Sequence, residues 1–229
     1  MGILRVLTWN MGYWQYRKRH EKAWEYLREE VKPDIALLQE CRPVEMSDNE
    51  QLLFKEIYQG WGTAIYLRNA SVKTVEFEQY PGRVVGAVAE FPGLPALHLA
   101  SIHAPIINQR VFPHLDKIFT EIEKKFNYKI SIIGGDLNSA RLAEKVWPRH
   151  GHGPFFDRID ESWFVDCRKR FYDSEIQTIF RPRQKHPFQD DHIFISQNLL
   201  EHVTKYHVLN NEVTRKLSDH IPVLIELHF

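Results

Sequence analysis

Four apolar, strand-like runs in this sequence each end on a polar side chain, and this recurrence constrains the fold more than any other feature. The runs are "LTWN", which ends on Asn10, "IALLQE", which ends on Glu40, "LASIH", which ends on His103, and "ISIIGGDLN", which ends on Asp136 and Asn138. In α/β sheets, ligands bind at the carboxyl ends of the strands. We therefore expect a chain with this pattern to gather these side chains at one edge of a sheet.

Two further strand-like runs begin, rather than end, on polar side chains. Asp191 precedes "HIFIS", and Asp219 and His220 precede "IPVLIEL". If these two strands run antiparallel to the other four, their beginnings adjoin the ends of the others. The sequence then predicts one cluster made of Asn10, Glu40, His103, Asp136, Asn138, Asp191, Asp219 and His220.

The remaining pattern predicts a mixed α/β protein. Short β-branched and apolar runs favour strands at residues 3–9, 35–39, 63–67, 72–77, 84–91, 97–102, 129–133, 192–196, 203–209 and 221–227. Apolar stripes at helical spacing favour helices at residues 19–31, 112–126 and 139–146. Residues 148–189 are expected to form a long irregular segment. Because several strands follow one another with only turns between them, we expect two packed mixed sheets flanked by helices.

Length and charge narrow the class of protein. The 229 residues fit one domain spanning 1–229, with 43% hydrophobic and 26% charged residues. Lys plus Arg and Asp plus Glu both number 30, so no overall field attracts or repels a polyanion. The sequence has no signal-peptide pattern and no run long enough to span a bilayer. Its two cysteines suit a reducing compartment, so the cytoplasm is the expected location. A monomer is the favoured oligomeric state.

The predicted cluster allows only a few kinds of chemistry. Several carboxylates together with amide oxygens suit Mg²⁺, with Mn²⁺ as an alternative. The chain has no cysteine cluster and no HExxH motif, which argues against zinc, and it lacks both GxSxG and a Walker-type glycine loop. A divalent ion beside a carboxylate and a histidine favours attack of water on a phosphorus ester. A phosphate-ester substrate is therefore expected, and nucleic acid is one candidate.

Six short motifs resemble one known family. "TWN", "LLQE", "SIHAP", "GGDLNS", "DDHIFIS" and "LSDHIPV" occur in the order and type seen in the endonuclease/exonuclease/phosphatase superfamily. That group includes deoxyribonuclease of the pancreatic type, apurinic endonucleases, neutral sphingomyelinases and inositol polyphosphate 5-phosphatases. The resemblance spans Thr8 to Val223, and it implies a four-layer α/β sandwich and a Mg²⁺-dependent phosphoesterase.

The resemblance also implies metal ligands. Glu40 resembles the principal metal carboxylate of the family, and Asn10 resembles its neighbour, which holds the ion or the phosphate. Asp219 resembles a second acid on the metal side.

Catalytic roles follow from the same resemblance. Asp136, with Asn138 beside it, resembles the carboxylate that positions the attacking water or protonates the leaving group. His220 resembles the histidine that contacts the scissile phosphate or acts as base. Asp191 resembles the acid that holds that histidine in its tautomer, and His103 matches a position that is His or Tyr in different branches.

The identity of the substrate is left open at this stage. Gln189 and Asp190 stand where family nucleases often carry Arg and an aliphatic residue, which puts strong contact with a DNA backbone in doubt. Candidate substrate contacts are Tyr13, Trp14, Arg181 and Arg183. A phosphodiesterase or nuclease is the first interpretation. The alternatives are a phosphatase of a lipid headgroup or small organophosphate, and a metal-binding interaction module without activity.

Overall fold

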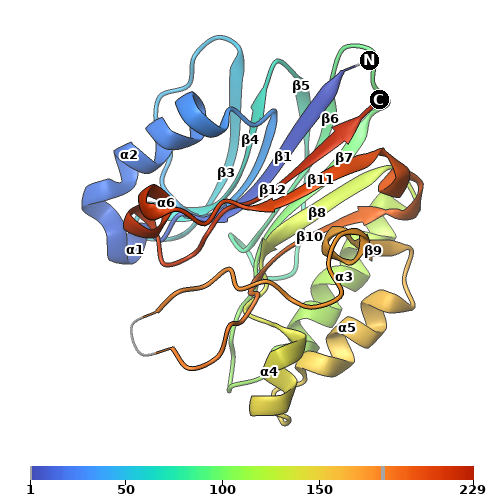
Figure 1. The fold of residues 1–229 in the computed structure, drawn as a ribbon. Helices are drawn as coiled ribbons and strands as arrows, with labels where there is room; N and C mark the ends of the chain where they lie inside the picture. Colours follow the sequence, from blue (N-terminus) through green and yellow to red (C-terminus); the bar gives the residue numbers. More distant parts are fainter. Residues whose placement is uncertain (1, 182–183) are drawn as a thin grey trace.

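The computed structural model describes residues 2–181 and 184–229, which form two six-stranded sheets and the helices around them (Figure 1). The first sheet consists of β1 (Ile3–Asn10), β2 (Ile35–Cys41), β3 (Glu50–Tyr58), β4 (Trp61–Arg68), β11 (Val203–Val208) and β12 (Val223–His228), in the order β11-β12-β1-β2-β4-β3. The second consists of β5 (Ser71–Val75), β6 (Val84–Glu90), β7 (Leu97–His103), β8 (Ser131–Asp136), β9 (Phe164–Asp166) and β10 (Asp191–Ser196), in the order β5-β6-β7-β8-β10-β9.

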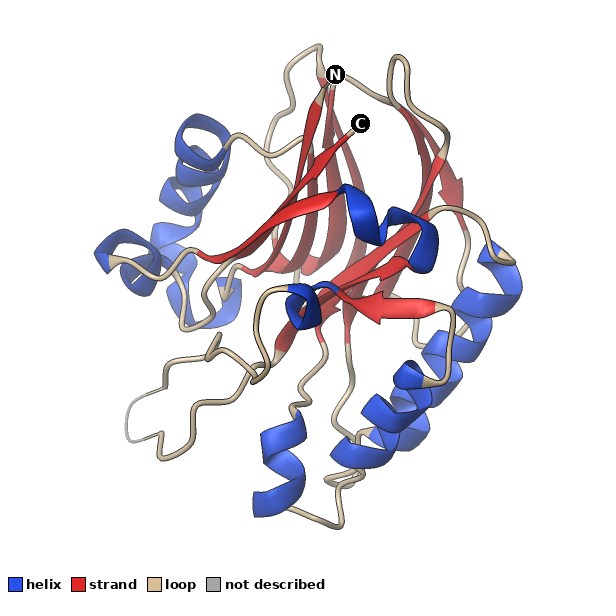
Figure 2. Cartoon of the chain, turned by 45° about the vertical axis from the view of Figure 1, so that its right-hand side comes forward, coloured by secondary structure: helices blue, strands red, loops and turns tan. Residues whose placement is uncertain are grey.

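Helices lie outside both sheets, so that the two sheets are enclosed between them (Figure 2). On the side of the first sheet lie α1 (Tyr13–Tyr16), α2 (His20–Glu25), which continues as a π-helical turn over Tyr26–Val31, and α6 (Glu212–Leu217). On the side of the second sheet lie α3 (Phe112–Phe126), α4 (Arg141–Val146) and α5 (His152–Asp160). Short 3-10 turns occupy Arg17–Arg19, Cys167–Arg170 and Gln197–His202.

Three apolar layers hold this arrangement together. The layer between the sheets includes Leu37, Ile65 and Ile193, all fully buried. Outside the second sheet, the ring of Phe119 on α3 packs edge-on against Phe194 of β10, with 5.7 Å between ring centroids. A third layer joins the first sheet to α2 and α6. The observed architecture is the predicted four-layer α/β sandwich with two mixed sheets.

Strand directions confirm the arrangement on which the predicted cluster depends. β1 and β2 are parallel, as are β7 and β8. β12 runs antiparallel to β1, and β10 runs antiparallel to β8 with Asp191 opposite Asp136. The beginnings of β10 and β12 therefore adjoin the ends of β8 and β1.

A glycine sets the approach of β8 to β7. Gly135 has φ +156°, and a Cβ atom built on it would lie 1.8 Å from the carbonyl oxygen of Ile102. Only glycine permits this contact, which places His103 and Asp136 opposite each other in the ladder. The "GGD" sequence thus has a geometric reason directly before a candidate catalytic carboxylate.

Several boundaries differ from those predicted. Residues 148–189 are not irregular throughout, since they contain α5, β9 and the turn Cys167–Arg170. The glycines and proline of "HGHGPFF" obscured the helical pattern of α5, whose Phe155, Phe156 and Ile159 are buried against the second sheet. β3 and α6 were also missed: β3 is an edge strand that is only partly buried, and α6 is short.

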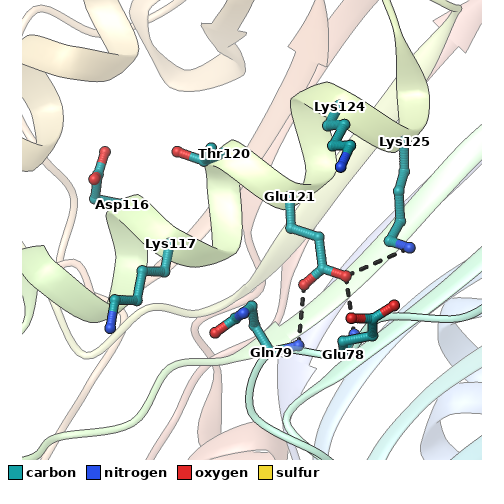
Figure 3. Close-up of a pocket in the computed structure, with 8 residues that line it drawn as sticks. All are labelled: Glu78, Gln79, Asp116, Lys117, Thr120, Glu121, Lys124 and Lys125. Carbon is teal, nitrogen blue, oxygen red and sulfur yellow. Dashed lines mark hydrogen bonds and ion pairs between the residues drawn. The ribbon is translucent and has the colours of Figure 1, made fainter.

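The loop that connects β5 and β6 is fixed to α3 at a surface hollow (Figure 3). The carboxylate of Glu121 accepts hydrogen bonds from the backbone N–H groups of Glu78 and Gln79, at 2.9 and 3.0 Å, and pairs with Lys125 at 3.5 Å. The hollow is therefore the place where Glu121 of α3 holds the backbone of this loop.

In the part of the chain that the structure describes, no helix has the length and apolar character needed to cross a membrane.

Candidate active site

The side chain of Asn10, at the end of β1, joins the two sheets at the centre of the cluster. Its Nδ2 donates to Oδ2 of Asp136 at 2.8 Å and to Oε1 of Glu40 at 3.3 Å. Its Oδ1 accepts from the backbone N–H of Gly12 at 2.9 Å, which fixes the orientation of the amide. Because Glu40 belongs to the first sheet and Asp136 to the second, the site spans the edge where the two sheets meet.

Glu40 reaches this position through an irregularity in β2. The pairing of β2 with β4 shifts register between Leu38 and Cys41, and Glu40 has a left-handed backbone with φ +45°. Bulges of this kind redirect side chains next to functional sites. Burial, and then the negative charge of Asp136, raise the pKa of Glu40. Two carboxylates thus share one amide donor, and their mutual repulsion favours a bound cation.

His103, at the end of β7, lies beside both of these carboxylates. Its Nε2 is 3.7 Å from Oε1 of Glu40 and 3.9 Å from Oδ2 of Asp136. Burial lowers the pKa of His103 to about 4, and the charge of Asp136 only partly offsets this effect. The imidazole is therefore neutral near pH 7 and can contact an anionic group without carrying charge itself.

His220 and Asp191 form a buried pair on the other side of Asp136. Nδ1 of His220 lies 2.9 Å from Oδ2 of Asp191, and Nε2 of His220 lies 3.8 Å from Oδ2 of Asp136. Asp191 is fully buried, and its backbone N–H donates to Oγ1 of Thr178. Burial alone lowers the pKa of His220, but the carboxylates of Asp191 and Asp136 outweigh it and raise that pKa overall.

Asp219 and Asn138 border the cluster. Oδ2 of Asp219 accepts from Nε of Arg181 at 3.3 Å, and most of the Asp219 side chain is buried while that of Arg181 is largely exposed. The backbone N–H of Asn138 donates to Oδ1 of Asp136 at 2.9 Å, and its Nδ2 donates to the carbonyl of Ala104. These contacts orient Asp136, whose Oδ2 faces the other members of the cluster.

The predicted substrate contacts are placed differently from one another. Tyr13 is buried: its hydroxyl accepts from Nη1 of Arg42 at 3.0 Å and its ring packs edge-on against His20, so the ring has a structural role and is not open for stacking. Trp14 is 63% exposed. Arg181 borders the site through Asp219, whereas Arg183 lies outside the described residues.

Arg83 belongs to this site and was not predicted. It directly precedes β6, its carbonyl accepts the backbone N–H of His103 at 2.8 Å, and its side chain is partly buried. Burial lowers the pKa of Arg83, and the charges of Asp136 and Glu40 raise it, so the guanidinium lies within the field of both carboxylates. The signal in the sequence is that Arg83 directly precedes β6. Strand β6 pairs with β7, and β7 ends in the site at His103.

A divalent cation fits the donors that are present. Glu40 and Asp136 supply hard carboxylate oxygens at the point where the Nδ2 of Asn10 joins them, while the Oδ1 of Asn10 is turned toward the N–H of Gly12. No set of three or more His, Cys, Asp or Glu side chains forms a closed metal cage within residues 2–181 and 184–229. Mg²⁺ rarely uses such a cage, because it is commonly held by one or two carboxylates, with water and substrate phosphate completing its shell.

Known proteins resemble this chain at two levels, family and fold. The model of the endonuclease/exonuclease/phosphatase family matches residues 7–220. No curated protein matches the sequence.

Solved structures share the fold at low identity. An AP endonuclease from Archaeoglobus fulgidus is 18% identical with a TM-score of 0.75, covering 99% of this chain and 100% of that one. An AP endonuclease from Leishmania major is 15% identical with a TM-score of 0.77, covering 99% and 88%. A 3′ phosphatase from Neisseria, bound to a product DNA hairpin, is 16% identical with a TM-score of 0.74, covering 99% and 100%.

Proposed function

Since the chain belongs to the endonuclease/exonuclease/phosphatase family, whose members are hydrolases of phosphoester bonds, we propose that it is a Mg²⁺-dependent phosphodiesterase of the nuclease type. The observation that carries this proposal is the bridge that Asn10 makes between Glu40 and Asp136. Imidazoles from His103 and His220 lie within 3.9 Å of the same carboxylate oxygens. Carboxylates, an amide and two imidazoles at one point suit hydrolysis of a phosphate ester.

In this proposal Glu40 is the principal metal ligand, with Asn10 and Asp219 on the same side of the site. A bound Mg²⁺, or Mn²⁺ in its place, supplies positive charge that neutralises the phosphoryl oxygens. The raised pKa of Glu40 supports this assignment, because a cation would relieve the repulsion between Glu40 and Asp136.

The other side chains orient the reactants and move protons. Asp191 holds the imidazole of His220 by its Nδ1, so that Nε2 of His220 faces Asp136 and the scissile phosphate. Asp136, oriented by Asn10 and by the backbone of Asn138, positions the attacking water or protonates the leaving oxygen. Neutral His103 and the Arg83 guanidinium contact the phosphoryl oxygens.

A substrate panel with Mg²⁺ tests the proposal. It comprises bis(p-nitrophenyl) phosphate, single- and double-stranded DNA, RNA, sphingomyelin, phosphoinositides and nucleotides, each assayed with Mg²⁺ and with EDTA. We expect Mg²⁺-dependent cleavage of the generic diester and of a nucleic acid. Turnover of phosphomonoesters or lipid headgroups alone would favour the phosphatase alternative, and binding without any turnover would favour an inactive interaction module.

Glu40→Gln is expected to raise the Mg²⁺ concentration for half-maximal activity by about tenfold or more, because a neutral amide replaces the principal carboxylate ligand. Calorimetric titration of each protein with Mg²⁺ measures the affinity independently of turnover. Glu212→Gln is the matched control, since Glu212 is exposed at the start of α6. A Glu40→Gln protein with the Mg²⁺ affinity of the wild type would remove Glu40 as a ligand.

Replacing Arg181 and Lys185 by alanine is expected to weaken binding of nucleic acid and to flatten its dependence on salt. Each lost phosphate contact lowers the slope of log K against log salt by about 0.7–0.9. Fluorescence anisotropy of a labelled oligonucleotide in EDTA measures both quantities without cleavage. Lys124→Ala on α3 is the control. An unchanged slope would indicate a small or lipid ester as substrate.

A further inference from the structure

A cavity of about 590 Å³ opens directly beside the catalytic cluster. Asn138, Arg181 and Asp190 line it on the side of the cluster, and Ile106, Trp147 and Phe188 contribute to its apolar walls. Its volume lies in the range of small-molecule sites. Because Asn138 contacts Asp136 and Arg181 contacts Asp219, the cavity adjoins the carboxylates of the cluster.

One wall of the cavity is built from aromatic rings. The ring centroids of Trp147 and Phe188 lie 5.1 Å apart, and Trp147 stacks on His150 at 5.8 Å with an interplanar angle of 11°. Trp147 is 43% exposed, so part of this side chain is accessible to a ligand. Exposed aromatic faces stack nucleobases. Arg181 and Lys185 add positive charge along the same cavity.

Asp190 places a carboxyl group in this otherwise apolar and cationic space. Its backbone is fixed on both sides, because its N–H donates to Oγ1 of Thr178 at 3.0 Å and its carbonyl accepts from the N–H of Leu137 at 2.8 Å. Its carboxyl oxygens receive no hydrogen bond from the described residues. Burial, and then the charge of Asp136, raise the pKa of Asp190 to about 7. The Asp190 side chain is partly buried, and a carboxyl without a partner in such a place is costly unless the ligand supplies one.

We propose that Asp190 selects esters with a free hydroxyl on the carbon next to the esterified one, and that the substrate class is ribonucleic acid. The inference rests on the proposed function. Asp190 lies beside the catalytic carboxylates, so it meets the atoms nearest the phosphate, while the more distant aromatic wall meets the base. The ribose 2′-hydroxyl is the group by which a protein distinguishes RNA from DNA. Deoxyribose would leave the Asp190 carboxyl without a hydrogen-bond partner.

The test compares kcat/KM for RNA and DNA oligonucleotides of identical sequence and length, in wild-type protein and in Asp190→Leu. We expect the wild type to prefer RNA, and Asp190→Leu to lower the RNA-to-DNA ratio by about 10- to 100-fold, the effect of losing a hydrogen bond to a charged or polarised group. Trp147→Ala is the matched control: it removes stacking for both sugars, so it lowers both values and keeps their ratio.

A second variant and a generic substrate make each outcome decisive. Asp190→Asn keeps the shape of the side chain and one acceptor oxygen, so it should lower the RNA-to-DNA ratio of kcat/KM less than Asp190→Leu does. It keeps the test valid if the leucine variant does not fold. Equal or better cleavage of DNA by the wild type, preference for a lipid or inositol phosphate ester, or a ratio that both variants leave unchanged would overturn the assignment. Absence of turnover on bis(p-nitrophenyl) phosphate would instead remove the proposed function and the inference with it.

Discussion

Replacing His220 by alanine is expected to lower kcat by about 10³-fold or more on any phosphodiester that the protein accepts, the upper range for loss of a positioned acid or base. The side chain is fully engaged in the site: Nδ1 contacts Asp191 at 2.9 Å and Nε2 faces Asp136 at 3.8 Å. Its removal takes away the group that contacts the phosphate or moves the proton. Steady-state kinetics at saturating Mg²⁺ measure the loss.

The same substitution leaves Asp191 buried without its partner, so folding must be measured as well. Near-ultraviolet circular dichroism and thermal unfolding report whether the variant retains its packed core. His202→Ala is the matched control, because the His202 imidazole contacts the carbonyl of His228 and stacks on Phe229, and no contact joins it to the cluster among the described residues. A folded His220→Ala protein with near-normal kcat would remove His220 from the mechanism.

Asp191→Asn is expected to lower kcat by about 10³- to 10⁴-fold while the fold is retained, because an amide cannot hold the imidazole in the required tautomer and charge state. Asp191 acts through His220 and does not touch the substrate, so it is a positioning residue. Asp116→Asn is the matched control, since Asp116 pairs with Arg158 at the surface of α3.

A readout other than turnover separates this role from a structural one. The carboxylates of Asp191 and Asp136 raise the pKa of His220, so loss of the Asp191 charge should lower that pKa. In the metal-free protein, the His220 resonance in an NMR titration should therefore change at lower pH in Asp191→Asn than in the wild type. A titration midpoint that does not move, or a kcat within a few fold of the wild type, would contradict the assigned pair.

The membership of the site could be predicted from the sequence because strand ends are visible in it. Apolar runs that stop at Asn10, Glu40, His103 and Asp136 predict one sheet edge, and this detail was wrong, because β1 and β2 belong to one sheet and β7 and β8 to the other. The register of β10 and β12 nevertheless brings Asp191 and His220 to the same place. Two packed sheets covered by helices follow from the same runs, since several of these strands are apolar on both faces and need cover on both sides. The four-layer sandwich itself was implied by the family resemblance.

What could not be predicted depends on contacts between segments that lie far apart in the chain. The left-handed backbone of Glu40 arises from the shifted pairing of β2 with β4, and no local pattern encodes it. Arg83 joins the site because its carbonyl pairs with His103 across a hairpin. Helix α5 was hidden by glycine and proline residues that disfavour helices locally, and its stability comes from Phe155 and Phe156 packed on the second sheet.

Asp190 and Asp191 are neighbours in the sequence, and they also show what the sequence alone could and could not predict. Alternation along a strand predicts that they face opposite ways. The structure adds what each one faces: His220 for Asp191, and an open cavity for Asp190. The alternation pattern predicts that the two carboxyl groups face different surroundings. Only the folded chain shows that the surroundings of Asp190 suit a ligand.

The most direct test of the central claim, that the cluster between the two sheets hydrolyses phosphodiesters with a divalent cation, is the hydrolysis of bis(p-nitrophenyl) phosphate by wild-type protein and Asp136→Ala, each with Mg²⁺ and with EDTA. The expected result is turnover by the wild type only with Mg²⁺, and a loss of about 10³-fold or more in Asp136→Ala with the fold intact. Wild-type turnover that persists in EDTA, or an Asp136→Ala protein as active as the wild type, would contradict the claim.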